Sequence, residues 1–362
     1  MSKERVIVVI DGQAGSCGKG KIAGYLALKE KVDAAVTNAM PNSGHVFEDE
    51  KGNKKIFRNI PVSSVNKETL LFMGAGSAID MAVLKKEYEE NADILKGREI
   101  IVHPRVPLIE ERHKKLEKEK IRSGSTFKGG GACLAEKVMR DERLKYFDKF
   151  GNIKSDEEYI KKINKVLENG GTLLIEGSQG CDLDLNNGTD YPHVTSRQCS
   201  VAQMVADSGI PISAVSDIIM VIRPYPIRIS NKTELGKIIS SGKYGEAKEI
   251  KWKEINSRSR ADLDDIDFTE TTTVTKKTRR VFELDIERLK NNILINRPTE
   301  IAFNFFEHLN ADYFGEKGNY NDVYITRYER EYINWLECEL NVPITMLGTG
   351  PKNDEIIIRN KS

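Results

Sequence analysis

The sequence predicts an α/β fold in which helices cover both faces of a mostly parallel central sheet and long functional loops join the elements. Residues 6–10 form an unbroken β-branched apolar run, which is typical of a strand buried on both faces. A glycine-rich loop and a helical pattern follow directly, and the order strand, glycine loop, helix then recurs along the chain. Strands that alternate with helices indicate parallel pairing, so ligands are expected at the carboxyl ends of the strands.

The other elements follow from local patterns, because short apolar runs predict strands and spacing near 3.6 residues predicts helices. The predicted strands are residues 69–73, 99–102 and 173–175, and the predicted helices are residues 22–28, 79–90 and 108–121. Long irregular segments are uncommon in compact domains unless they are functional or disordered. We therefore expect functional loops in three polar stretches without clear period, residues 122–131, 180–197 and 252–278.

Composition excludes several classes of protein. The 362 residues carry 56 Lys and Arg against 55 Asp and Glu, a net charge of +1, whereas a general nucleic-acid binder usually shows a basic excess. No apolar run approaches the ~20 residues of a membrane helix, and the N-terminus lacks the apolar core of a signal peptide. The five cysteines are scattered, which argues against a disulfide framework or a zinc knuckle. We expect a cytoplasmic protein that binds neither nucleic acid nor membrane.

Residues 12–21, the glycine-rich loop, predict a phosphate-binding site and a P-loop-like fold. Glycines let the backbone turn sharply and approach phosphate oxygens, and the following helix presents free N–H groups and the positive end of its dipole. Lys19 would reach the terminal phosphates. The loop departs from the usual P-loop pattern because five residues separate Gly12 from Gly18, and because Gly20 replaces the Ser or Thr that would bind magnesium.

Residues 11–22, DGQAGSCGKGKI, resemble the first loop of the adenylosuccinate synthetases. Further matches follow in the family's order: NSGH at 42–45, GST at 124–126, KVMR at 137–140, EGSQG at 176–180, YPHVTS at 191–196, the Thr- and Arg-rich residues 273–280, and GTGP at 348–351. These motifs run along nearly the whole chain and serve one reaction. Although the length would allow two domains, we expect residues 1–362 to form one large α/β domain with inserted loops.

Departures from the family pattern indicate one branch of the family. Ser16 stands where the family has its catalytic Asp, and Phe305 stands where the guanine-recognising strand has Lys. Residues 10–16, 22–27 and 272–282 resemble the phage-type 2-amino-2′-deoxyadenylosuccinate synthases. This resemblance implies a C–N bond-forming ligase that condenses dGMP with L-aspartate, driven by ATP or dATP through a 6-phosphoryl intermediate. The product would lead to diaminopurine nucleotides for phage DNA, so a phage-encoded enzyme would act in the host cytoplasm.

The resemblance also assigns site residues. The implied catalytic residues are Ser16, Lys19 and His45, with His45 acting at the oxygen that is phosphorylated, a role that imidazole suits near neutral pH. The donor nucleotide and its phosphates would contact Gly15, Ser16, Cys17, Gly18, Lys19, Gly20, Lys21, Gly44, His45, Phe305, Gly348, Gly350 and Pro351. The dGMP would contact Ser16, Asn42, Ser125, Thr126, Arg140, Gln179 and Thr195. L-Aspartate would contact Thr272, Thr273, Val274, Thr275, Lys277 and Arg279.

The resemblance further implies a metal ion, a donor base and a quaternary structure. Mg²⁺ would be held by Ser16 and by the Gly44 carbonyl, an oxygen ligand that suits this ion. The stacking environment of Phe305 and Phe306 favours ATP or dATP over GTP. Arg140 resembles the family's arginine that reaches the phosphate bound by the partner subunit, so a homodimer with shared sites is implied.

Ser16 raises a chemical question, because a hydroxyl cannot act as a carboxylate base at pH 7. The 2-amino group of dGMP lies beside the ring nitrogen that loses its proton, and a shorter side chain leaves room for it. We hypothesise that Ser16 accommodates or hydrogen-bonds the 2-amino edge, while the proton leaves through water, phosphate or Asp11. Two alternatives remain at this point: an ordinary adenylosuccinate synthetase that uses IMP and GTP, and a nucleotide-binding relative without catalytic activity.

Overall fold

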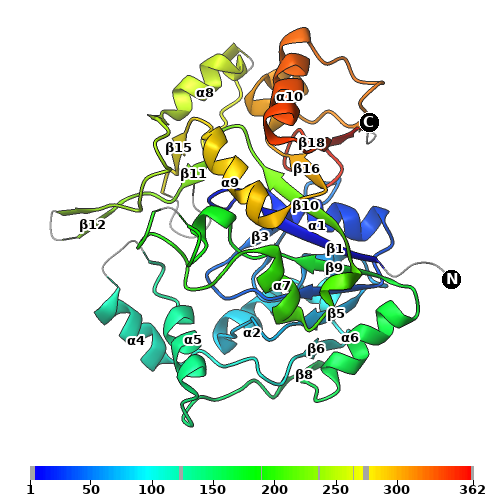
Figure 1. The fold of residues 1–362 in the computed structure, drawn as a ribbon, viewed down its shortest axis with the longest axis vertical. Coiled ribbons are helices and arrows are strands. Elements are labelled where there is room, and N and C mark those ends of the chain that lie inside the picture. Colours follow the sequence, from blue (N-terminus) through cyan, green and yellow to red (C-terminus); the bar gives the residue numbers. More distant parts are fainter. Residues whose placement is uncertain are drawn as a thin grey trace.

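Twelve strands form one sheet through the middle of the molecule (Figure 1). The computed structural model describes residues 5–121, 125–188, 190–234, 237–263, 265–271 and 277–359. In spatial order the strands are β17 (Gly318–Asn319), β19 (Ile356–Ile358), β18 (Ile344–Gly348), β16 (Glu300–Phe303), β10 (Val215–Ile222), β1 (Arg5–Asp11), β9 (Thr172–Glu176), β2 (Ala34–Thr37), β5 (Leu70–Met73), β6 (Ile100–Val102), β8 (Ile153–Ser155) and β7 (Lys149–Phe150). All neighbours are parallel except β18–β19 and β7–β8. The predicted mostly parallel sheet is therefore confirmed.

The two faces of the sheet are separate apolar layers, and β1 contributes to both because its side chains alternate. Ile7 and Val9 pack with α1 (Lys19–Lys29) in one buried cluster. Val8, on the opposite face, belongs to a second cluster that includes residues of α7 (Val201–Ser208), α9 (Ile286–Asn296) and α10 (Arg327–Leu340). Since helices pack on both faces, this part of the prediction is confirmed as well.

The remaining helices are α2 (Met81–Glu90), α3 (Ala92–Leu95), α4 (Glu111–Lys120), α5 (Gly130–Met139), α6 (Tyr159–Glu168) and α8 (Trp252–Arg258). The predicted helix at residues 22–28 begins three residues earlier, at Lys19. The prediction that residues 252–278 are irregular was wrong for their first part, because α8 buries Trp252 and Ile255 against neighbouring elements. Residues 130 and 131 likewise belong to α5 and not to a loop.

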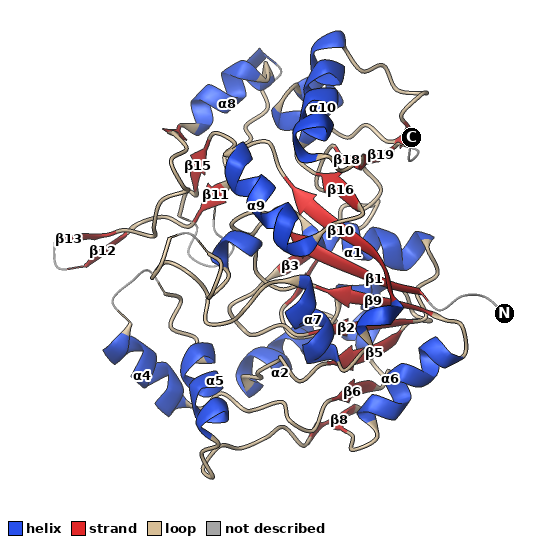
Figure 2. Cartoon of the chain, in the orientation of Figure 1, coloured by secondary structure: helices blue, strands red, loops and turns tan. Residues whose placement is uncertain are grey.

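Short strands outside the main sheet surround the carboxyl ends of its central strands. They are β3 (His45–Glu48) with β4 (Lys54–Phe57), β11 (Ile227–Arg228) with β15 (Arg280–Phe282) and β14 (Glu249–Ile250), and β12 (Lys232–Glu234) with β13 (Lys237–Ile239). Figure 2 shows β9 and β10 pointing to the same side of the molecule, with long loops gathered there and β12 and β13 projecting outward. This edge is where the parallel topology predicts a ligand site.

All five cysteines are free, and Cys17, Cys133, Cys181 and Cys199 are buried. Within the described ranges, no helix combines the length and the apolar composition needed to cross a membrane.

Candidate active site

The glycine-rich loop lies between β1 and α1 and is organised around the carboxylate of Asp11, the last residue of β1. Asp11 Oδ1 accepts hydrogen bonds from the backbone N–H groups of Gln13 (3.0 Å) and Gly15 (3.2 Å). Its Oδ2 accepts from the N–H of Cys17 (3.0 Å). The chain turns through positive φ at Gly15 (88°), Ser16 (60°) and Gly18 (86°), a region that glycine enters without strain. Asp11 therefore acts as an internal anion that fixes the shape of the loop.

The two lysines after the loop have different partners. Lys19 Nζ donates to Asp11 Oδ2 at 3.3 Å and to the Gln179 carbonyl at 2.7 Å, so its ammonium faces the loop. Lys21 Nζ donates at 2.6 Å to the carbonyls of both Gly350 and Glu355, and burial lowers its pKa to about 8. Lys21 thus holds the chain around Gly350, whereas Lys19 lies beside the glycine-rich loop.

Cys17 is not a reactive thiolate in this loop. Its thiol donates to Gln13 Oε1 at 3.1 Å, and burial raises its pKa well above the usual value. The reactive form of cysteine is the thiolate, so the residue acts as a buried small side chain.

His45 comes close to the phosphate loop because α1 packs tightly on β3. A Cβ added at Gly20 would lie 2.8 Å from the carbonyl oxygen of Val46 and 3.1 Å from Cβ of His45, so only glycine allows this approach. Desolvation, followed by the nearby Lys19 ammonium, lowers the pKa of His45 to about 3. The imidazole is therefore neutral at pH 7, so one ring nitrogen can donate a hydrogen bond and the other can accept one.

Gly44 and Asn42 precede His45 in the same segment. Gly44 is exposed, and its Cα faces open space, with no atom within 4 Å of where a Cβ would stand. The amide oxygen Asn42 Oδ1 is buried and accepts no hydrogen bond from any described residue. Buried polar atoms are nearly always partnered, so Asn42 points to a ligand or ordered water at this place.

Gln179 and Thr195 approach the site from the chain that follows β9. Gln179 has φ 65°, and the next residue, Gly180, lies so near the phosphate loop that a Cβ there would be 2.2 Å from the Gln13 carbonyl. Thr195 N–H donates to the Leu183 carbonyl at 2.7 Å. Its hydroxyl oxygen is buried without a hydrogen-bond partner among the described residues, as Asn42 Oδ1 is.

The predicted residues Ser125 and Thr126 lie just before α5, and Arg140 lies at its C-terminal end. Ser125 Oγ accepts from the N–H of Phe127 at 3.1 Å, and Thr126 is exposed. Arg140 is an exposed residue in left-handed conformation at the C-cap of α5, and Figure 1 shows α5 well separated from α1. The structure of one chain therefore does not bring Arg140 to the phosphate loop.

Arg279 is the predicted aspartate-binding residue that meets the phosphate loop, where its Nη1 donates to Ser16 Oγ at 2.9 Å. Lys277 is exposed, and Thr272, Thr273, Val274 and Thr275 lie outside the described residues. Sequence reasoning missed Arg223, which is fully buried and donates from Nη1 to the Ser16 carbonyl at 3.1 Å. Its position directly after β10, at the carboxyl end of a predicted parallel sheet, is the signal that could have found it.

Phe305 lies on the other side of Arg223, with the guanidinium carbon 3.8 Å from the centre of its ring. The neighbouring Asn304 donates to the carbonyls of Cys17 (2.8 Å) and Gly18 (3.2 Å). Glu307 is buried, and burial raises its pKa to about 7. An aromatic ring, and not an exposed carboxylate, therefore faces the phosphate loop from this segment.

The 348–351 segment follows β18 and reaches the same place. A Cβ at Gly348 would lie 2.0 Å from Asn304 Oδ1, so β18 and β16 meet closely beside the loop. Gly350 contributes its carbonyl to Lys21, and Pro351 is exposed. The ends of β1, β9, β10, β16 and β18 thus converge around the glycine-rich loop.

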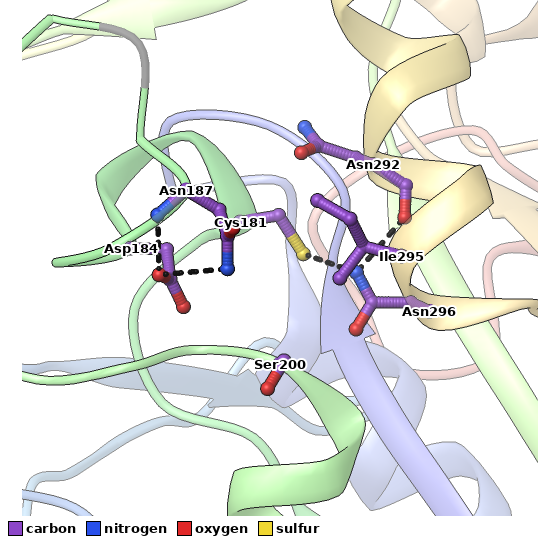
Figure 3. A pocket seen from close by; sticks show the side chains of 7 residues that line it. All are labelled: Cys181, Asp184, Asn187, Ser200, Asn292, Ile295 and Asn296. Carbon is purple, nitrogen blue, oxygen red and sulfur yellow. Dashed lines mark hydrogen bonds between the residues drawn. The ribbon is translucent and has the colours of Figure 1, made fainter.

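A small hollow lies behind this region, where the chain after β9 meets α9 (Figure 3). It has a volume of about 10 Å³ and is lined by Cys181, Asp184, Asn187, Ser200, Asn292, Ile295 and Asn296. Asn296 Nδ2 donates to Cys181 Sγ at 3.5 Å across it. The hollow has room for about one water molecule, so it is too small to hold a nucleotide.

The parallel sheet and the cations gathered at the end of β1 define a nucleotide-binding α/β protein suited to phosphoryl transfer, which depends on positioning and on neutralising charge. The family model described as adenylosuccinate synthetase matches residues 8–157 and 141–312. The chain belongs to the adenylosuccinate synthetase family and is a C–N bond-forming ligase.

Individual relatives refine this placement. An N6-succino-2-amino-2′-deoxyadenylate synthase from Vibrio phage phiVC8 is 33% identical over 369 residues, with 98% of each chain covered. An adenylosuccinate synthetase from Methanococcus aeolicus is 30% identical over 356 residues, covering 97% of this chain and 98% of the relative. The cyanophage S-2L succinoaminodeoxyadenylate synthetase, solved bound to dGMP and to dATP as an energy donor, superimposes with a TM-score of 0.82 at 25% identity, covering 99% and 96% of the two chains.

Proposed function

We propose that this chain condenses dGMP with L-aspartate, using ATP or dATP as the phosphoryl donor, to give 2-amino-2′-deoxy-N6-succinyladenylate for diaminopurine nucleotide synthesis. The observation that carries the proposal is the hydrogen bond of 2.9 Å between Arg279 and Ser16 Oγ. It places a cation suited to the aspartate carboxylate next to the serine that has replaced an acid. The names of the Vibrio phage relative and the cyanophage enzyme support the same reaction.

The reaction has two steps, and each needs charge stabilisation at a different atom. The γ-phosphoryl group passes to the 6-oxygen of the purine, and the L-aspartate amine then forms the new C–N bond while the 6-oxygen leaves with the phosphate. Lys19, buried beside the loop, offsets the charge on the transferred phosphoryl group. The neutral His45 imidazole donates a hydrogen bond to the 6-oxygen as that oxygen takes up the phosphoryl group.

The purine and its sugar phosphate would lie between Ser16 and the unpartnered groups Asn42 Oδ1 and Thr195 Oγ1. The Ser16 hydroxyl meets the 2-amino edge. Asp11 already accepts four hydrogen bonds from the loop and Lys19, so it is poorly placed to take the ring proton. We infer that this proton leaves through water or the transferred phosphate.

A magnesium ion fits the residues present, although in the described part of the chain no three His, Cys, Asp or Glu side chains gather as a metal site. Mg²⁺ is commonly held by one or two protein oxygens, several waters and substrate phosphates. The exposed Gly44 carbonyl and Ser16 Oγ would supply those protein oxygens. When bound, the ion would neutralise charge on the donor phosphates.

The donor base is proposed to be adenine, because Phe305 offers a ring for stacking and Glu307, buried as it is, does not offer guanine an accessible carboxylate. The GTP-using alternative would need such a partner for the guanine N–H groups.

We further propose that the chain works as a single domain in the cytoplasm.

The active form is proposed to be a homodimer in which Arg140 reaches the nucleotide of the partner subunit. Arg140 is exposed, and the two residues before it, Val138 and Met139, are 80% and 75% exposed. Exposed apolar side chains gathered in one place often mark an interface. Sedimentation of the wild-type protein tests this, since a fully active monomer would remove Arg140 from the site.

The substrate assignment is tested by incubating the protein with L-aspartate and each pairing of dGMP or IMP with ATP or GTP. Mass spectrometry of the products should find the succinylated 2-amino nucleotide from dGMP and ATP. Condensation with IMP and GTP alone would indicate an ordinary adenylosuccinate synthetase. The absence of product in every mixture would indicate a nucleotide-binding relative without catalysis.

A further inference from the structure

Two arginines from distant parts of the chain hold Ser16 from both sides. Arg223, after β10, donates to the Ser16 carbonyl at 3.1 Å, and Arg279, before β15, donates to the Ser16 hydroxyl at 2.9 Å. Ser16 has φ 60°, a conformation that is uncommon for a residue with a side chain. The position of its hydroxyl therefore depends on these two guanidinium groups.

Glu270 lies between the same two arginines. Its Oε1 accepts a hydrogen bond from Arg223 Nη2, and its Oε2 lies 3.8 Å from Arg279 Nε. The Glu270 carbonyl also accepts from the backbone N–H of Arg279 at 2.9 Å. One carboxylate thus connects the aspartate-binding arginine to the arginine buried behind the phosphate loop.

The charge of Glu270 is needed because Arg223 is fully buried and a guanidinium keeps its proton in proteins. A buried cation without a counter-ion is costly. Among the described residues, Glu270 is the carboxylate that accepts a hydrogen bond from the Arg223 side chain. Glu307 also lies near Arg223, but its strongest interaction with a charged group is with Lys21.

Glu270 contacts Arg223 and Arg279 with different geometry, and the difference indicates a role for Glu270. The carboxylate is hydrogen-bonded to the buried Arg223, whereas its pairing with Arg279 is looser and the Glu270 side chain is 22% exposed. An incoming carboxylate could therefore bind Arg279 without displacing Glu270 from Arg223. Asp11 would keep the loop in shape meanwhile, because it holds the loop N–H groups by itself.

We propose that Glu270 is a positioning residue that, anchored on Arg223, orients Arg279 toward Ser16 and so presents a guanidinium to the L-aspartate carboxylate beside the purine. The identity of that carboxylate rests on the proposed function. The coupling of Glu270 to Arg279 does not depend on the proposed function and can be measured without turnover.

The test uses three variants of the full chain. Glu270→Gln keeps the size of the side chain and removes its charge, and Glu270→Asp keeps the charge on a shorter stem. Glu110→Gln is the matched control, because Glu110 also bridges two cations, Arg112 (3.0 Å) and Lys145 (2.8 Å), and its side chain is 28% exposed. Glu110 lies at the start of α4, outside the proposed site.

Steady-state kinetics should show a KM for L-aspartate at least about tenfold higher in E270Q, with the KM for the donor nucleotide unchanged. E270D should recover part of the loss, and E110Q should behave as wild type. Parallel changes in the KM of all three substrates together with a lower melting temperature would mean a merely structural role and would overturn the proposal. An unchanged KM for L-aspartate in E270Q would overturn it as well.

Hydrogen exchange provides the readout that does not need activity. The peptide containing Arg279 should exchange faster in E270Q than in wild type and E110Q, because loss of the side-chain bridge loosens the segment pairing in which the Arg279 N–H donates to the Glu270 carbonyl. If the wild-type protein forms no product from dGMP and L-aspartate, the proposed function fails, and exchange alone decides the role of Glu270. Faster exchange would then support the coupling, and unchanged exchange would contradict it.

Discussion

Replacing Ser16 by Asp should shift the preference of the enzyme from dGMP toward IMP. The left-handed conformation at φ 60° tolerates Asp better than most residues, so the variant should fold. The introduced carboxylate would stand where Ser16 Oγ now accepts from Arg279 at 2.9 Å. It would occupy part of the space proposed for the 2-amino group of dGMP, whereas IMP has no group there.

The size of the shift follows from the cost of crowding one amino group or leaving it unpaired. A buried polar group without its partner costs about 1–3 kcal/mol, which corresponds to roughly 5- to 150-fold in the ratio of two rate constants. The assay is kcat/KM for dGMP and for IMP in wild type, Ser16→Asp and Ser16→Ala. Ser16→Ala removes the hydroxyl that meets the 2-amino group but leaves space in which water can pair with that group, so its ratio should move less than that of the crowded Ser16→Asp. An unchanged ratio in Ser16→Asp would refute the reasoning.

Three further predictions concern other residues of the site. Lys19→Ala should lower kcat/KM by about 100-fold or more. Lys21→Ala removes the hydrogen bonds to the carbonyls of Gly350 and Glu355, so it should chiefly lower the melting temperature. Equal losses of kcat/KM in the two variants would contradict this difference in roles. Because burial and Lys19 lower the pKa of His45 to about 3 from 6.5, kcat/KM of the free enzyme should show no titration of His45 near pH 6.5. Below pH 6.5 the unfolded state binds a proton at His45 that the folded state does not, so the free energy of unfolding decreases as pH falls from about 6.5 toward 3. Denaturant unfolding at two pH values should show a smaller decrease in this free energy for His45→Gln than for wild type. Gly18→Ala should lower the melting temperature more than Gly97→Ala. Both glycines have positive φ (86° and 82°), but of the two only Gly18 would bring its new Cβ against another atom, Asn304 Nδ2 at 2.5 Å. Equal melting temperatures for the two variants would argue against the close contact.

The central part of the fold was predictable because its information is local. The β-branched run of β1, the glycines after it and the helical spacing of α1 are consecutive in sequence, and their pattern indicates both the buried strand and the loop. The placement of ligands at strand ends follows from parallel topology. The helix α8 was missed because it buries only two apolar side chains, Trp252 and Ile255, in a cluster completed by distant residues such as Tyr225 and Val281.

The contacts that complete the candidate site could not be predicted in the same way. Arg223 and Glu270 are 47 positions apart and meet only after folding, and neither is part of a recognisable motif. The role of Asp11 in fixing the loop depends on the particular turn that follows it. Lys21 has the sequence context of a phosphate ligand, yet the 350–355 segment takes its hydrogen bonds. Sequence patterns identified residue types at the site, and long-range pairing decided their partners.

The most direct test of the proposed reaction follows the 6-oxygen of the substrate. The protein is incubated with ATP, L-aspartate and dGMP labelled with oxygen-18 at its 6-oxo group, and the inorganic phosphate and the nucleotide product are analysed by mass spectrometry. The account predicts one labelled oxygen in the phosphate for each succinylated 2-amino nucleotide formed. Product formation with unlabelled phosphate, or no product with ATP and dGMP, would contradict it.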